Sequence, residues 1–391
     1  MDIHADIYDE FRCIGGDCRR NCCQGWAITI DPKTTKYYRS LDDEFGKMIN
    51  SRLDFLEDGS SKFALKKGER CPAQREDGLC DIFCRYGEDK LSKTCTRFPR
   101  YNVDVYGNNE FRYLSNDCEE VLRILYDRED NLNLIIEAKD KKDLNENATV
   151  NDFAQLVAWC TDTIQDESIP LWNALITVMH ICIEASKPFV DVDMEKYQKV
   201  IDSIPSVSNS YNRAISEIPA DMLYGIAWER IKLISVAYLD FLNLTDFKIY
   251  TEMFPSKEKY SASVPNRGEQ IKEQFERFVS KTNQKDARFY RRYIANLFLT
   301  FCFDLLFDDA NEKMLFEFGV KVIVSLTVPP LWDDEALTDR DEFFSRFAML
   351  QRMSKTNYMS HLSKPIKEQM NPGLTDYALM FAGLFSGMPG L

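Results

Sequence analysis

From residue 151 onward, apolar residues recur with the 3.6-residue period of amphipathic α-helices. Asp286 stands where a helix N-cap is expected, because its side chain can accept from the first free backbone N–H groups of a helix. Pro329 and Pro330 end the helix before them, since a proline disfavours helical backbone in the preceding residue. The pattern therefore predicts a large helical body. Its helices are expected over residues 151–166, 169–186, 194–203, 221–244, 269–281, 286–307, 312–326, 341–354 and 375–385.

The first third of the chain has a different pattern, with short apolar runs between turn-forming residues. Residues 26–30 read as a short β-type run that stops at Asp31 and Pro32. Asp31 can cap a helix in which Pro32 takes the first position, where a missing N–H costs nothing. The further elements expected here are a hairpin of strands 101–106 and 110–114 around Gly107 and Asn108, and a helix over residues 117–126.

These patterns predict a mainly α protein with three parts. Residues 1–127 form a cysteine-rich, loop-rich head with little β structure. Residues 128–150 contain the polar run AKDKKDLNEN and are expected as a linker or an exposed loop. Residues 151–391 form the helical body. Neither an internal repeat nor a low-complexity tract occurs in the sequence.

Charge and apolar run length exclude two classes of protein. The 391 residues include 49 Lys and Arg against 63 Asp and Glu, which gives a formal net charge of −14. This balance argues against a nonspecific nucleic-acid binder. The apolar run Leu171–Ile183 contains Asn173 and His180 and is too short to span a bilayer. The N-terminus lacks the basic region of a secretory signal, so we expect a cytoplasmic protein. We also expect a monomer that associates with neither nucleic acid nor membrane.

Cysteine placement carries the chemical information. Of the 12 cysteines, nine lie between Cys13 and Cys118, and the chain has only 3 histidines. In a reducing cytosol such clustering indicates metal binding or catalysis more often than disulfides. Thiolates are soft ligands that suit zinc or an iron–sulfur cluster. The three cysteines outside the head lie on apolar helix faces and are expected to pack in the core: Cys160, Cys182 and Cys302.

Three blocks of the head resemble the flagellin lysine-N-methylase family of FliB-like proteins. They are FRCIGGDCRRNCCQGWAITID at residues 11–31, CPAQREDGLCDIFCRYGEDKLSKTCTRFPR at 71–100 and YLSNDCEEVLRIL at 113–125. The first block also contains the CxxxCC core shared with putative iron- or zinc-chelating proteins. Glu119 stands where the family has proline, and Cys84 where it has no cysteine.

The resemblance implies a bacterial, cytoplasmic enzyme that transfers a methyl group from S-adenosylmethionine to lysines of flagellin. It also implies a cysteine-bound iron–sulfur cluster, expected to be of the 4Fe–4S type, with zinc as the alternative metal. The family cysteines correspond to eight positions here: Cys13, Cys18, Cys22, Cys23, Cys71, Cys80, Cys95 and Cys118.

Eight thiolates exceed the need of one cluster, so either two metal sites coexist or some of the eight only pack. Adjacent side chains in extended backbone point apart, and we therefore do not expect Cys22 and Cys23 to bind the same cluster. The set expected to ligate is one of these two together with Cys18, Cys71 and Cys95. Cys80, which follows a turn at Gly78, is the next candidate.

The cofactor site has no familiar signature. The chain lacks the glycine-rich motifs of dinucleotide and P-loop proteins, so a Rossmann methyltransferase is not expected. It also lacks the CxxxCxxC of radical S-adenosylmethionine enzymes, because Gly87 stands where the third cysteine would be. Arg97 and Arg100 are candidates for hydrogen bonds to cluster sulfides or to the carboxylate of S-adenosylmethionine, or for surface ion pairs.

Lysine methylation needs a neutral amine, and hence a general base or a desolvating cavity, because the ordinary pKa of lysine is ~10.4. No catalytic residue is singled out by the sequence. The alternative function is a non-enzymatic iron- or zinc-binding protein with a helical interaction body, which uses the same thiolates for storage, delivery or a structural staple.

Overall fold

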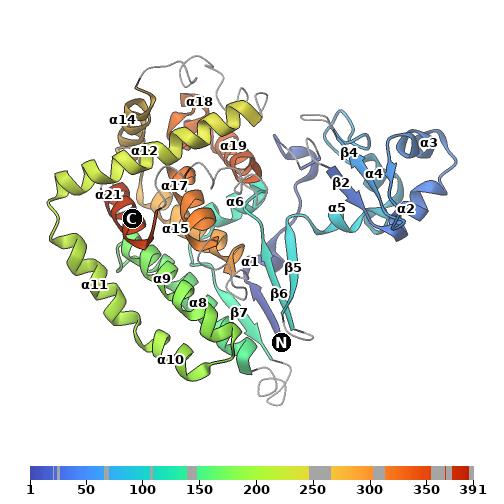
Figure 1. Cartoon of the computed structure of the whole chain (residues 1–391). Helices are drawn as coiled ribbons and strands as arrows, with labels where there is room; N and C mark the ends of the chain where they lie inside the picture. The colour runs from blue at the N-terminus through green and yellow to red at the C-terminus, as the bar shows by residue number, and fades with distance from the viewer. Residues whose placement is uncertain are drawn as a thin grey trace.

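The computed structural model describes residues 1–20, 22–23, 27–65, 70–105, 109–138, 148–245, 266–302, 313–353, 366 and 372–386. Figure 1 shows a large helical body and a smaller lobe beside it that contains α2, α3, α4 and α5. The fold is mainly helical, as the pattern of apolar residues predicts. Among the described residues, no helix combines the length and apolarity that a bilayer crossing requires.

Helices of the body lie close to the predicted ranges. Two of them were not predicted, α11 (Ile204–Ser216) and α18 (Asp334–Thr338). α11 carries apolar residues at helical spacing, Ile204, Val207, Tyr211 and Ile215, which pack partly buried against the core and which the prediction overlooked, while α18 is only 5 residues long. A 3₁₀ turn, η5 (Pro329–Leu331), was not predicted either. The others are α8 (Ala148–Gln165), α9 (Leu171–Val190), α10 (Met194–Asp202), α12 (Ala220–Thr245), α14 (Arg267–Val279), α15 (Gln284–Leu299), η4 (Lys313–Phe318), α17 (Gly319–Thr327), α19 (Arg340–Met353) and α21 (Leu374–Phe385).

Some predicted helix ends differ or lie outside the described residues. α15 begins at Gln284 because Asn283 is its N-cap, and Asp286 completes a capping box by accepting from the backbone N–H of Asn283. The prediction of Asp286 as the N-cap is therefore wrong by one turn. The end of α17 at Thr327, just before Pro329, agrees with the sequence. Residues 303–307, 312 and 354, which we predicted as helical, lie outside the described residues.

A four-stranded sheet joins the first residues of the chain to the body. Its strand order is β5-β6-β1-β7, in which β1 is parallel to β6 and antiparallel to β7. The predicted hairpin forms this sheet's β5 and β6, although its turn lies outside the described residues. The strands are β1 (Asp2–Ala5), β5 (Arg100–Val105), β6 (Asn109–Leu114) and β7 (Leu134–Glu137).

β7 lies in the segment that we expected as a linker or an exposed loop. Leu134, Ile135 and Ile136 favour a strand because apolar and β-branched side chains suit a pleated surface, and they pair along β1. The charged run that follows them led to the different prediction. Residues 139–147 of that run lie outside the described residues.

The lobe has its own small core, built on a three-stranded sheet of order β2-β4-β3. Asp31 caps α2 as predicted, accepting from the backbone N–H of Thr34 at 3.2 Å. Ile28, Ile30 and Phe63 from the sheet are buried with Tyr38 of α2. The elements are β2 (Ala27–Ile30), α2 (Pro32–Arg39), α3 (Glu44–Ser51), β3 (Asp54–Phe55), β4 (Ser61–Ala64), α4 (Asp81–Tyr86) and α5 (Lys93–Arg97).

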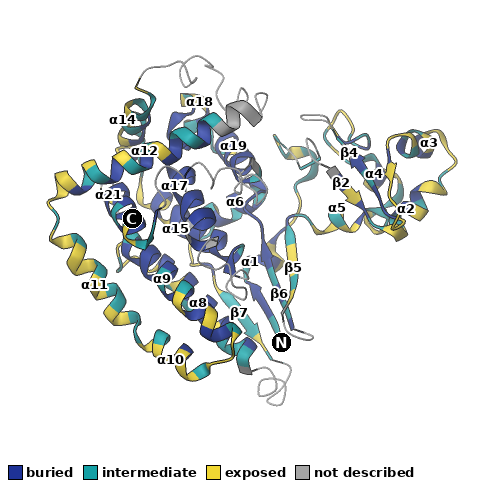
Figure 2. Cartoon of the chain, viewed as in Figure 1, coloured by how far each residue is buried: buried dark blue, intermediate teal, exposed yellow. Residues whose placement is uncertain are grey.

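The remaining parts of the N-terminal third pack with the helical body. Ile3, Ile7 and Phe11 share one hydrophobic core with β6, with α6 (Glu119–Asp127) and with the body helices. Figure 2 shows the continuous buried region through the body and a second one inside the lobe. The cysteine-rich third therefore contributes to two cores, with Cys71 in the lobe and Cys118 in the body.

Helices α12 and α21 pack so closely that a glycine is required at their contact. A Cβ at Gly383 would lie 2.2 Å from the Cβ of Ala227. We predict that Gly383→Ala lowers the free energy of unfolding by about 1–3 kcal/mol, because overpacking forces the helices apart.

The matched control for this prediction is Gly225→Ala on α12, where nothing lies within 4 Å of the added methyl group. This variant should be neutral or more stable by up to ~1 kcal/mol, since alanine is the better helix former. Chemical denaturation measures both. Equal effects of the two substitutions would contradict the close packing.

Candidate functional site

The eight family-like cysteines lie in loops, at helix ends or in the short helix α5. Cys13 and Cys18 flank a 3₁₀ turn, and Cys118 occupies the N-cap position of α6. Cys80 takes the N-cap position of α4, and Cys95 lies within α5. Cys84, which we treated as a spare, is exposed on α4. The three core cysteines are buried as expected: Cys160, Cys182 and Cys302.

Four of the eight thiols gather inside the lobe, and we call them the lobe thiols: Cys23, Cys71, Cys80 and Cys95. The backbone N–H of Cys71 donates to the carbonyl oxygen of Cys23 at 2.7 Å. A β-bridge between Gln74 and Cys80 closes the turn that follows Cys71. The buried phenol of Tyr38 lies within electrostatic reach of the Cys71, Cys80 and Cys95 thiols.

The other four gather at the start of α6, and we call them the junction thiols: Cys13, Cys18, Cys22 and Cys118. Two side chains hold their segments together. Glu119 accepts the backbone N–H of Arg19 at 3.0 Å. The guanidinium of Arg352 donates to the carbonyl oxygens of Arg20 and Asp117, each at 2.8 Å. The segment that contains Cys18 and Cys22 is therefore pinned beside Cys118.

Burial and mutual repulsion keep these thiols protonated in the absence of a bound cation. Burial, together with negative charge on Cys95 and Cys80, raises the pKa of Cys71 to about 12, although the backbone N–H of Ala73 opposes the shift. Burial likewise raises the pKa of Cys118 to about 12, opposed in part by backbone N–H groups and by Arg352. For Cys18, burial, Glu119 and neighbouring thiolates all raise the pKa.

Cys22 connects the two groups. Charge on its sulfur would raise the pKa of Cys13, Cys18 and Cys118 on one side, and of Cys71 and Cys95 on the other. The adjacent Cys23 makes a side-chain hydrogen bond with it, and that bond raises the Cys23 pKa most. Cys22 and Cys23 are thus in contact with each other, and the expectation that they do not bind one cluster together stays a prediction.

The donor set fits a thiophilic metal or cluster by its chemistry. One carboxylate oxygen of Glu119, a residue 2% exposed, has no hydrogen-bond partner among the described residues, and it lies beside Cys18. A nearby cation would satisfy this oxygen and stabilise neighbouring thiolates. In the part of the chain that the structure describes, no three Cys, His, Asp or Glu side chains are placed to hold a single metal ion.

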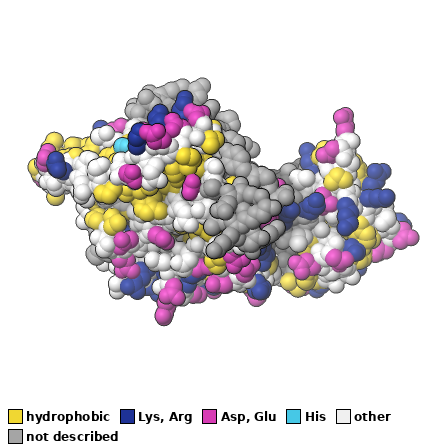
Figure 3. Space-filling view, turned by 90° about the horizontal axis from the view of Figure 1, so that it is seen from below, with side chains coloured by type: hydrophobic (Ala, Val, Ile, Leu, Met, Phe, Trp, Pro, Cys, Tyr) yellow, Lys and Arg dark blue, Asp and Glu magenta, His cyan; other side chains and the backbone are white. Residues whose placement is uncertain are grey.

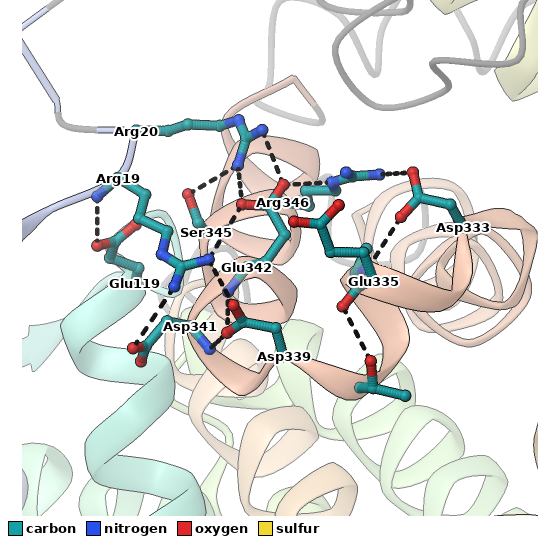
Figure 4. Close-up of polar contacts among 12 residues, drawn as sticks. Arg19, Arg20, Glu119, Asp333, Glu335, Asp339, Asp341, Glu342, Ser345 and Arg346 are labelled. Carbon is teal, nitrogen blue, oxygen red and sulfur yellow. Dashed lines mark hydrogen bonds and ion pairs between the residues drawn. The ribbon is translucent and has the colours of Figure 1, made fainter.

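Arg19 and Arg20, between Cys18 and Cys22, fasten this segment to α19 (Figure 4). Arg20 binds Glu342 at 2.8 Å and donates to the Ser345 hydroxyl at 3.2 Å. Arg19 binds Asp339 at 2.9 Å. We call these contacts the arginine clamp.

Glu342 is the central acceptor of the arginine clamp. It also accepts from the buried guanidinium of Arg346 at 2.6 Å, and Arg346 in turn reaches Asp333 at 3.0 Å. Burial alone would raise the Glu342 pKa, but the bonds from Arg20 and Arg346 bring it below its ordinary value. Glu342 is therefore ionised at neutral pH and holds two guanidinium groups at once.

The two arginines expected at a cofactor lie elsewhere. Arg100 of β5 donates to the carbonyl oxygen of Phe11 at 2.9 Å, and its guanidinium carbon lies 4.8 Å from the ring centre of Phe11. It is also within electrostatic reach of Cys13. Arg97 is exposed at the end of α5. Their predicted contacts with a cluster or with S-adenosylmethionine stay predictions.

Sequence reasoning found the cysteines but missed the arginine clamp. Its signals were present: an Arg19–Arg20 pair inside the first motif, and Glu342 and Arg346 four residues apart on one helix. What the sequence did not show is that these two segments meet, because 320 residues separate Arg19 from Asp339.

The fold and the site define the class of protein: a mainly α-helical protein whose cysteine-rich N-terminal part is fixed to the helical body by arginines. Over 124 residues the chain is 36% identical to the lysine-N-methylases of Salmonella typhimurium and Salmonella choleraesuis. This match covers 30% of the chain and 31% of each relative, so less than a third of each relative's length is compared.

The chain is equally similar, 36% over 124 residues, to the flagellar biosynthetic protein FliU of Salmonella muenchen, of which the match covers 73%. The chain belongs to the family of FliU and the Salmonella lysine-N-methylases, as the three motif blocks indicated. No family model matches the chain. No solved structure matches it either.

We predict that Glu342→Gln loosens the arginine clamp, because Arg20 and Arg346 lose the charge that they share. The expected cost is about 1–3 kcal/mol in the free energy of unfolding, together with faster amide exchange over residues 18–23. Glu335→Gln on the exposed face of α18 is the matched control and should change neither quantity. Unchanged exchange over residues 18–23 in Glu342→Gln would contradict the arginine clamp.

Acid should release the arginine clamp in the same way. The pKa values of Glu342, Asp339 and Asp333 are all lowered in the folded protein. Their stabilisation is therefore complete above the ordinary carboxyl pKa of ~4 and is lost as pH falls through the lower folded values. We expect exchange over residues 18–23 to rise only below about pH 4. A rise that begins near pH 6 would point to other groups.

Proposed function

We propose that the protein is a protein-lysine N-methyltransferase that uses S-adenosylmethionine and acts on flagellin. The similarity to proteins named lysine-N-methylase and to a flagellar biosynthetic protein is the observation that carries this proposal. The size of the helical body supports an enzyme, because a chelator needs no such body.

We also propose that the junction and lobe thiols hold an iron–sulfur cluster. The support is the chemistry of the donor set: six thiols from several segments lie within electrostatic reach of Cys22, and their pKa values are raised where no cation neutralises them. When bound, such a cluster supplies iron atoms ligated by thiolate sulfur, and its potential is tuned by charge and hydrogen bonds. Cys22, between the two groups, is the thiol on which we expect metal binding to depend most.

The residues of this chain then have separable roles. Arg352 and Glu119 hold the segment of Cys18 and Cys22 beside Cys118, and the arginine clamp fixes it to α19.

Acidic side chains are distributed over the surface together with basic ones, as Figure 3 shows for one face. The formal charge of −14 favours approach of a lysine-bearing protein through long-range attraction.

A direct test is methylation of flagellin by anaerobically purified protein and S-adenosylmethionine, followed by mass spectrometry of flagellin lysines. Methyl increments on lysine support the proposal. Exchangeable iron or zinc without any methylation would favour the alternative, a metal-storage or metal-delivery protein.

Cys22→Ser tests the thiol assignment. We expect it to lose most of the bound metal, the visible absorbance of thiolate-ligated iron and the methyl transfer, because Cys22 lies between both groups of thiols. Cys84→Ser is the matched control, since Cys84 is an exposed cysteine of the lobe at which the family has none, and it should retain all three. Metal analysis and circular dichroism on both variants separate loss of metal from loss of folding. Full metal content in Cys22→Ser would refute the assignment.

A further inference from the structure

A cavity of about 130 Å³ lies in the body where α14, α15, α18 and α19 meet. Its volume is close to that of an engineered cavity of about 150 Å³ that binds one benzene ring. None of the eight family-like cysteines lines it. The cavity can therefore accept one flat ring, with the rest of a larger ligand outside it.

Two buried hydrogen-bonding groups of this cavity lack partners among the described residues. Tyr290 is 1% exposed and its hydroxyl has no hydrogen bond; Trp332 is 5% exposed and its indole N–H has none. Buried polar groups are almost always paired, so a site with two unpaired ones points to a ligand. Burial raises the pKa of Tyr290, which keeps its hydroxyl protonated.

Ligand class follows from these groups. An indole N–H only donates, so the ligand has to present an acceptor to Trp332. A lysine ammonium group is excluded there because it also only donates. Aromatic walls favour a flat ring: Trp332 and Phe343 pack edge to face with centroids 5.6 Å apart, and Phe289 is a further aromatic residue of the lining. A heteroaromatic ring with acceptor nitrogens meets both conditions.

The lining also carries cations suited to an anionic group. Arg277 and Lys281 are exposed residues of the lining, and Arg277 lies only 4.0 Å from Asp334, at the limit of an ion pair. The third lining cation, Arg340, is held by Asp286 at 2.8 Å. A carboxylate or phosphate outside the buried ring would meet Arg277 and Lys281, because guanidinium and ammonium groups bind such anions.

The cavity and the arginine clamp share one helix. α19 contributes Arg340 and Phe343 to the cavity, and Glu342 and Arg346 to the contacts that hold Arg20. A ligand in the cavity is therefore bound by the helix that fixes the cysteine segment.

We propose that this cavity binds the adenine ring of S-adenosylmethionine, with the carboxylate of the methyl donor near Arg277 and Lys281. The proposal rests on the proposed function for the identity of the ligand. An adenine nucleotide, with phosphate in place of the carboxylate, has the same recognition chemistry, and the experiment separates the two.

The experiment is calorimetric titration of the anaerobically purified full-length protein with S-adenosylhomocysteine, which cannot donate a methyl group, and separately with ATP. Tyr290→Phe and Trp332→Phe each remove one hydrogen-bonding group and keep an aromatic ring. Trp172→Phe on α9 is the matched control, because Trp172 does not line the cavity. Flagellin methylation is measured in parallel.

We expect S-adenosylhomocysteine to bind wild type and Trp172→Phe with equal affinity, and to bind wild type more tightly than ATP does. Each cavity variant should bind it about tenfold more weakly, because the loss of one such hydrogen bond raises Kd about tenfold. Tyr290→Phe should be as thermally stable as wild type, because it removes a hydroxyl that has no partner among the described residues. A lower affinity of this variant would therefore show a lost contact with the ligand and not a folding defect.

The outcomes separate the two proposals. Equal affinity of the cavity variants and wild type overturns the cavity assignment while methylation still supports the function. Binding that depends on Tyr290 and Trp332 without any methylation overturns the function and keeps the cavity as an adenosine site. Tighter binding of ATP than of S-adenosylhomocysteine would show that the methyl donor is not the ligand of the cavity. If neither compound binds, the cavity assignment is wrong.

Discussion

The structure depends on how one short segment, which carries Cys18 and Cys22, is held between the lobe and the body. Exposed ion pairs contribute little to stability, but several of these contacts are partly or fully shielded. Glu342 and Arg346 are buried, and Arg352 satisfies two backbone carbonyl oxygens from different segments. Removing one side chain of a buried pair leaves its partner without a hydrogen bond, so the loss of any of these side chains lowers the stability of the fold. The position of the cysteines is thus set by contacts with the C-terminal helices.

The held segment also brings thiols close enough to affect one another's ionisation. Thiols with raised pKa values resist ionisation, and the folded chain gathers six of them within electrostatic reach of Cys22: Cys13, Cys18, Cys23, Cys71, Cys95 and Cys118. A bound metal centre would reverse that preference, so metal binding and the docking of the lobe are expected to reinforce each other. One oxygen of Glu119 has no hydrogen-bond partner among the residues that the structure describes, and it lies near Cys18 as an acceptor beside the junction thiols. The α19 helix then links the segment of Cys18 and Cys22 to the aromatic cavity.

Much of the fold could be predicted from the sequence. The helical period identified most helices of the body, but α11 was missed although its Ile204, Val207, Tyr211 and Ile215 recur at helical spacing and pack against the core. β7 was missed because a charged run follows it, although its pairing with β1 depends on three apolar residues. The eight cysteines were predicted from spacing and family resemblance. Their division into lobe and junction thiols was not, because it depends on bonds such as that from Cys71 to Cys23. The arginine clamp and the cavity join distant segments, which a single sequence does not reveal.

The central claim is that the thiols around Cys22 bind a metal centre through sulfur. X-ray absorption at the iron and zinc edges of the anaerobically purified full-length protein tests it most directly. The account predicts stoichiometric iron with a first shell of sulfur and with iron–iron scattering from a cluster. Protein free of both metals, or metal bound through nitrogen and oxygen, would contradict it.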